Sequence, residues 1–179
     1  MPTIISILRG INVGQRKVLM ADLKSLYEKL GFKDVITYIQ SGNVIFKTDK
    51  KISHQKLAEK IEKVISKQYG FDVPVINRTH EELKRIILTN PFLKIKEIDK
   101  SKLHVTFLAA EPDQVNRKLV QEFDYSPDKF IISGTEVFLY IPVSYAETKL
   151  SNKFFESKLK VSATTRNWNT VTKLVELAV

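Results

Sequence analysis

The run from Arg9 to Lys17, which reads RGINVGQRK, carries three cations and no carboxylate. It joins an apolar stretch at residues 3–8 to a helical pattern at residues 19–30. The backbone N–H groups that begin a helix attract anions, and nearby cations add to that attraction. We therefore interpret this run as the first candidate site, with a phosphate or carboxylate group as its ligand.

The same run has an alternative, purely structural interpretation. Gly10 and Gly14 suit backbone positions with positive φ, and Asn12 suits a side-chain bond to the backbone of a turn. The two glycines lie four residues apart and no lysine follows the second directly. The run is therefore not a P-loop, which needs glycines five apart and then a lysine.

Two further segments combine amides with other polar groups. Tyr38–Asn43 reads YIQSGN and predicts a tight turn, which we expect to lie beside the first loop. Thr165–Asn169 reads TRNWN and brings an arginine close to a predicted helix start, which suits anion binding or base stacking. Local turn bonding in the first segment, and a capping Asn167 with a buried Trp168 in the second, are the structural alternatives. The candidate ligand-binding residues are Arg9, Asn12, Gly14, Arg16, Lys17, Gln40, Asn43, Arg166 and Asn167.

Other patterns of catalysis and metal binding are not evident in the sequence. His54, His80 and His104 show no spacing typical of metal ligands. Ser53–Lys56 matches the S-x-x-K pattern of some acyl-transfer enzymes, but we expect Ser53 to cap a helix. We assign no metal, no cofactor and no catalytic residue, and leave open whether the protein is an enzyme.

The first half of the chain must supply the elements that position the first two segments. The hydrophobic spacing predicts strands at residues 3–8, 35–40, 43–47 and 71–77, and helices at residues 19–30 and from about residue 53. Gly31 closes the first helix, and Ser41-Gly42 makes the turn of a hairpin. The order βαββαβ is the ferredoxin-like arrangement, in which two helices cover one face of an antiparallel sheet.

The second half repeats this order. A capping box at Thr79–Glu82 opens a connecting helix that ends near Asn90. We predict strands at residues 103–109, 129–133, 136–142 and 161–165, helices at residues 112–122 and 151–160, and a terminal helix capped by Asn167. The fold class is therefore α+β, with two tandem ferredoxin-like subdomains at residues 1–78 and 102–179, joined by a helix and linker at residues 79–101.

Composition favours a protein of the cytoplasm. The 179 residues include no cysteine, which excludes disulfides and thiolate sites and suits a reducing compartment. No stretch approaches the roughly 20 apolar residues of a membrane span, so we expect no membrane partner. The net charge of +9 is uneven, because residues 1–90 carry 16 Lys/Arg against 9 Asp/Glu while residues 91–144 carry 7 against 8. Such an excess suits polyanions, but it is also a way to keep a protein in solution.

Motifs in constant order along the chain resemble a bacterial family known as domain of unknown function sixteen-ninety-seven. They are the run Leu8–Gly14, the run Thr37–Val44 and the run Thr164–Val171, which read LRGINVG, TYIQSGNV and TTRNWNTV. The resemblance implies a cytoplasmic protein of two ferredoxin-like subdomains and brings no known activity or catalytic residue. Gln15 stands where the family usually has a second glycine after Gly14, so any role that needs extra backbone freedom there is in doubt.

Three functional hypotheses follow from these observations. The first is an anion-directed binding protein for a phosphate-containing small ligand or a nucleotide. The second is a nucleic-acid-binding protein that uses its basic surface, although the predicted strands lack the stacking aromatics and RNP1 pattern of an RRM. The third is a structural or protein-interaction role without a ligand. The sequence assigns no oligomeric state.

Overall fold

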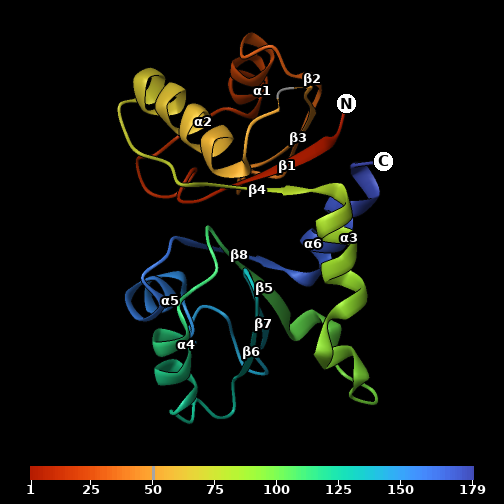
Figure 1. The fold of residues 1–179 in the computed structure, drawn as a ribbon, viewed down its shortest axis with the longest axis vertical. Helices are drawn as coiled ribbons and strands as arrows, with labels where there is room; N and C mark the ends of the chain where they lie inside the picture. The colour runs from red at the N-terminus through yellow and green to blue at the C-terminus, as the bar shows by residue number, and fades with distance from the viewer. Residues whose placement is uncertain (50) are drawn as a thin grey trace. The chain divides into compact units, whose positions relative to one another are not determined.

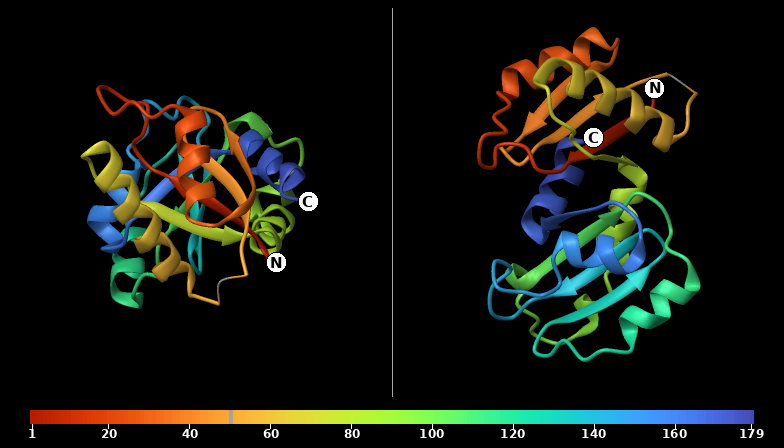
Figure 2. Two further views of the ribbon diagram at one scale, coloured as in Figure 1. Left: turned by 90° about the horizontal axis from the view of Figure 1, so that it is seen from above. Right: turned by 90° about the vertical axis from the view of Figure 1, so that its left-hand side faces the viewer.

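The computed structural model describes residues 1–49 and 51–179. The chain divides into two compact units, unit 1 with residues 1–85 and 173–179, and unit 2 with residues 86–172. Figures 1 and 2 show a four-stranded antiparallel sheet with helices in each unit. In the part of the chain described, no helix has the length and apolarity needed to cross a membrane.

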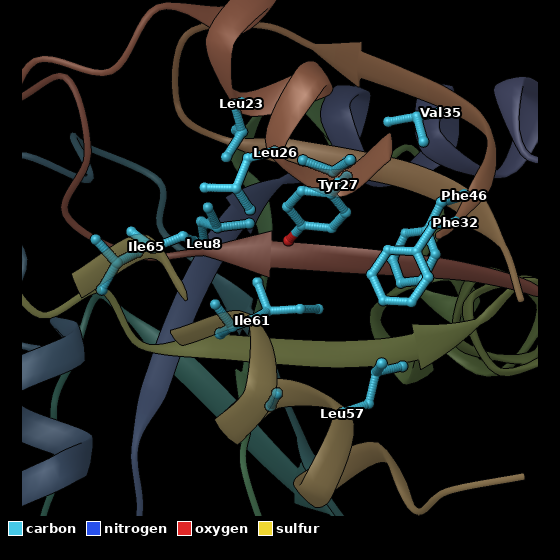
Figure 3. Packing of buried hydrophobic residues seen from close by; sticks show 14 of the residues in the cluster. Leu8, Leu23, Leu26, Tyr27, Phe32, Val35, Phe46, Leu57, Ile61 and Ile65 are labelled. Carbon is cyan, nitrogen blue, oxygen red and sulfur yellow. The ribbon is translucent and has the colours of Figure 1, made fainter. Parts of the chain in front are cut away.

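Unit 1 contains one sheet in the order β2-β3-β1-β4, with every neighbouring pair antiparallel. Its elements are β1 (Thr3–Leu8), α1 (Met20–Lys29), β2 (Lys33–Tyr38), β3 (Asn43–Lys47), α2 (His54–Tyr69) and β4 (Val75–Thr79). Side chains alternate between the two faces of a strand, so Ile4 and Leu8 of β1 lie on the face that α1 and α2 cover. The rings of Phe32 and Phe46 stack in this core, and Ile61 of α2 is fully buried there (Figure 3).

Unit 2 repeats this architecture, with its sheet in the order β6-β7-β5-β8. Its elements are β5 (Leu103–Leu108), α4 (Gln114–Gln121), β6 (Lys129–Ser133), β7 (Glu136–Tyr140), α5 (Asn152–Leu159) and β8 (Ala163–Asn167). Val120 of α4 and Phe155 of α5 share one core with the inward side chains of this sheet. The 3₁₀ turns η1 (Pro91–Lys94) and η2 (Lys100–Lys102) precede β5.

Two more helices contain the boundaries between the units. They are α3 (His80–Thr89) and α6 (Trp168–Leu177). The predicted capping box before α3 is confirmed, because Glu82 N–H donates to Thr79 Oγ1 at 3.1 Å and Thr79 N–H donates to Glu82 Oε2 at 2.7 Å. The sequence prediction of a strand at residues 71–77 is wrong at both ends, because β4 covers Val75–Thr79. The strand starts only after Pro74, which has no N–H to give to the ladder, and it continues to Thr79, which pairs with Ile4.

A side-chain relay at the sheet centre recurs in both units. In unit 1, Ser6 Oγ donates to Asn77 Oδ1 at 2.6 Å, and Asn77 Nδ2 donates to the carbonyl of His54, the first residue of α2. In unit 2, Thr106 and Thr165 share a 2.7 Å hydroxyl contact, and Thr165 Oγ1 donates to Asn152 Oδ1 at the start of α5. Each relay joins an inner strand and the edge strand beside it to a helix start, so the repeated order of elements extends to polar contacts between side chains.

Candidate functional site

The loop between β1 and α1 is a set of tight backbone turns. Asn12 N–H donates to the Arg16 carbonyl at 2.7 Å, and Arg16 N–H donates back to the Val13 carbonyl at 3.1 Å. Gly10 and Gly14 have φ values of 75° and 57°, in the left-handed region that favours glycine. The structural interpretation of the two glycines is confirmed, and the turns hold Arg16 and Lys17 directly before α1.

Asn12 joins this loop to the β2–β3 hairpin. Its Nδ2 donates to the Gln40 carbonyl at 2.8 Å, and its Oδ1 accepts from Val18 N–H at 2.9 Å. The predicted side-chain bond of Asn12 to the backbone is confirmed, and the loop and hairpin do lie side by side. Gly42 packs closely here, because a Cβ built on it would lie 2.5 Å from Ile11 Cδ1.

Arg16 is held in place by contacts that leave its charge available. Its Nη1 donates to the Asp72 carbonyl at 3.2 Å, and its guanidinium lies over the ring of Phe71, 5.4 Å from the centroid. Neither Arg16 nor the exposed Lys17 forms an ion pair with a carboxylate within residues 1–49 and 51–179. A backbone carbonyl and an aromatic face orient a cation without neutralising it.

Helix α1 begins without a side-chain cap. Its N-cap residue is Leu19, whose side chain accepts no hydrogen bond. Side-chain oxygens do cap the starts of α2, α4, α5 and α6, from Ser53, Asp113, Ser151 and Asn167. The first N–H groups of α1 thus retain hydrogen-bonding capacity for water or a ligand.

The hairpin residues Gln40 and Asn43 differ in their surroundings. Gln40 is exposed and contributes its carbonyl to Asn12. Asn43 is buried, and its Nδ2 donates to the Tyr38 carbonyl at 3.0 Å and to Ser41 Oγ at 3.3 Å. The structural interpretation of this turn is confirmed, with Gly42 at a φ of 83°.

The third predicted segment lies in unit 2, where Arg166 belongs to strand β8 and precedes the helix start. Arg166 is only 8% exposed, and its Nη1 donates to Thr164 Oγ1 and to the Thr165 carbonyl. Burial lowers the pKa of Arg166 to about 10, so the side chain stays protonated at neutral pH. Asn167 caps α6 by accepting from Thr170 N–H at 2.8 Å, and Trp168 is buried, which confirms the structural alternative for both.

Sequence reasoning missed two hollows in unit 2. They lie beside residues 121–131, have volumes of about 430 and 400 Å³, and share Phe123, Tyr125 and Asp128 among their lining residues. The signal was the cluster of three aromatics within eight residues, at 123, 125 and 130, beside a Ser-Pro loop.

Comparisons with known proteins identify a family and a fold. A family model described as "Protein of unknown function (DUF1697)" matches residues 1–138, so it includes the first two motifs and stops before the third. A solved structure described as conserved bacterial protein SP0830 from Streptococcus pneumoniae is 24% identical, with a TM-score of 0.78 over 99% of this chain and 98% of that one. No curated protein matches the chain.

Proposed function

We infer the function from geometry, because the chain belongs to the family that this model describes and that description assigns no activity. We propose that the protein binds anions at the β1–α1 loop. We assign Arg16 and Lys17 with the first turn of α1 to the site and keep two neighbouring candidates, Arg9 at the start of the loop and Gln40, whose carbonyl accepts from Asn12. Its ligand is a phosphate- or carboxylate-bearing small molecule or a nucleotide.

The start of α1 has no side-chain cap, and two cations, Arg16 and Lys17, directly precede it in the chain. This combination is the main support for the proposal. Lys17 lies only two residues before Leu19, the N-cap residue, so the positive end of the helix and the lysine act on the same volume. Asp22 is the one carboxylate in the first turn. Burial and, after it, the negative charge of Asp22 raise the pKa of Tyr69 in α2.

Support for a small ligand over an RRM-like RNA platform comes from the sheet. We assign each unit to the ferredoxin-like fold, on its strand order and its two helices on one face. In β1 and β3, which carry the stacking rings of an RRM, the one aromatic is Phe46, and it packs into the helix-side core. Ile5, Ile7 and Ile45 alternate to the other face and offer no ring for a base. The absence of cysteine supports a cytoplasmic location.

Calorimetric titration with pyrophosphate and ATP tests the proposal. The double substitution Arg16→Ala/Lys17→Ala is expected to weaken binding about tenfold, because each charge-assisted hydrogen bond to an anion contributes about 1.5–3 kcal/mol when well formed and less when exposed. The matched control Lys56→Ala/Lys60→Ala removes the same charge from exposed positions of α2 and is expected to leave the affinity within about twofold.

If both double variants weakened binding equally, the loss of affinity would follow from net charge alone. That result would contradict a specific site at the β1–α1 loop. A titration of Arg166→Lys tests the predicted contribution of the third segment, and unchanged affinity would place the site on unit 1 alone. Single-stranded RNA is the third arm, since binding that falls steeply with salt and exceeds that of ATP would favour the nucleic-acid hypothesis.

A further inference from the structure

The two hollows of unit 2 form a second candidate site, independent of the β1–α1 loop of unit 1. Both lie against the segment from Phe123 to Asp128, which forms the wall they share. Their volumes, about 430 and 400 Å³, fall within the range of small-molecule sites in proteins. The segment connects α4 to β6 and belongs entirely to unit 2.

Aromatic rings make the apolar part of this wall. Tyr125 contacts Phe130 at 5.5 Å and Phe154 at 5.2 Å between ring centroids, both edge to face, so its ring is fixed by the core behind it. Phe123 lies 6.3 Å from Tyr125 and is 60% exposed, although a large apolar ring normally packs inside. A fixed ring and an exposed ring at the mouth of a hollow provide faces for a ligand.

Carboxylates make the polar part. Asp124 Oδ1 accepts from Ser126 N–H at 2.9 Å and from Ser126 Oγ at 2.6 Å, and these bonds lower the pKa of Asp124. Asp128 accepts from Thr148 Oγ1 and is half-buried. Lys129 lines the first hollow, and Lys149 lines the second together with Glu147.

The balance of these charges is negative in both hollows. The first has two carboxylates and one lysine, and the second has three carboxylates and one lysine. Residues 121–131, which line most of the two hollows, carry 3 Asp/Glu and 1 Lys/Arg, a net −2 in a chain of net +9. This segment is thus opposite in sign to the chain as a whole and disfavours anions.

We propose that the hollows beside Phe123–Ile131 bind a small organic cation with an apolar body, such as a protonated amine or a quaternary ammonium. The faces of Phe123 and Tyr125 attract a cation through their quadrupoles and cover its apolar body. Asp124 and Asp128 supply the opposite charge on the same wall, and the combination of opposite charge with ring faces selects against neutral and anionic analogues.

Three probes that each have a phenyl ring and a two-carbon side chain test the charge preference, namely phenethylammonium, 2-phenylethanol and phenylacetate. An NMR titration of the ¹⁵N-labelled full chain is expected to show shifts at residues 121–131, with phenethylammonium binding about tenfold more tightly than 2-phenylethanol. Phenylacetate is expected to bind most weakly of the three. Equal affinity for the amine and the alcohol, or shifts confined to other residues, would overturn the proposal.

Substitutions separate the ring from the charge. Phe123→Ala is expected to weaken phenethylammonium binding about three- to tenfold, while Val143→Ala, at another exposed apolar residue of unit 2, is expected to leave it unchanged. Asp128→Asn is expected to weaken the amine and leave the alcohol unaffected, so the alcohol reports whether the hollow is still intact. If Asp128→Asn left the affinity for the amine unchanged while the alcohol still bound, the carboxylate would have no role and the proposal would be wrong.

Discussion

Replacing Phe46 with alanine is expected to lower the free energy of unfolding by about 3–5 kcal/mol, as for other buried phenylalanines. Phe46 is fully buried in β3, with its ring centroid 4.4 Å from that of Phe32 and 5.3 Å from that of Tyr27. The substitution removes these contacts and leaves a cavity between the sheet and the two helices. Denaturant unfolding followed by circular dichroism measures the loss, and hydrogen exchange assigns it to unit 1.

The control is Ile36→Ala on the neighbouring strand β2, where the side chain is exposed. Its expected cost is below about 1 kcal/mol, because the isoleucine loses little buried area. A loss for Phe46→Ala no larger than that of the control would mean that the aromatic cluster is not the core of unit 1.

Gly42→Ala is expected to destabilise the protein by about 2–4 kcal/mol. The left-handed backbone of Gly42 costs alanine about 1 kcal/mol, and the added Cβ would meet Ile11 Cδ1 at 2.5 Å and Leu8 Cβ at 3.1 Å. Because Ile11 belongs to the β1–α1 loop, the variant is also expected to weaken pyrophosphate binding. Thermal unfolding and the calorimetric titration measure the two effects on the same sample.

Gly70→Ala is the matched control. Gly70 has a similar φ of 78° at the end of α2, but no atom of the described residues lies within 4 Å of the Cβ that would be added. Only the backbone cost of about 1 kcal/mol remains. If the two variants lost equal stability, the close packing of the hairpin against the loop would be disproved.

Hydrophobic periodicity sufficed to predict most of the elements. The strand at residues 129–133 was predicted with the bounds it has, and Ser53, the Thr79–Glu82 box and Asn167 cap their helices as expected. Such signals are local, so a sequence contains them. The start of β4 was missed because Phe71, Asp72 and Val73 alternate apolar and polar side chains as a strand does, but they precede Pro74 and lie outside the ladder.

The candidate site was predictable only in part. Positive φ at Gly10 and Gly14 and the bond from Asn12 follow from local turn chemistry. The burial of Arg166 was not predictable, because the face of a strand that is covered depends on tertiary packing. The hollows beside Tyr125 were missed because most of their lining belongs to one irregular segment, residues 121–131, whose conformation depends on tertiary packing.

An NMR titration of the ¹⁵N-labelled chain with pyrophosphate tests the claim that the β1–α1 loop and the first turn of α1 bind an anion. We expect saturable shifts at the amides of residues 13–22, with half-saturation at about tenfold higher pyrophosphate in the Arg16→Ala/Lys17→Ala variant and within about twofold of the unsubstituted chain in the Lys56→Ala/Lys60→Ala control. Saturable shifts elsewhere with none at residues 13–22, or no saturable shifts at all, would contradict the claim.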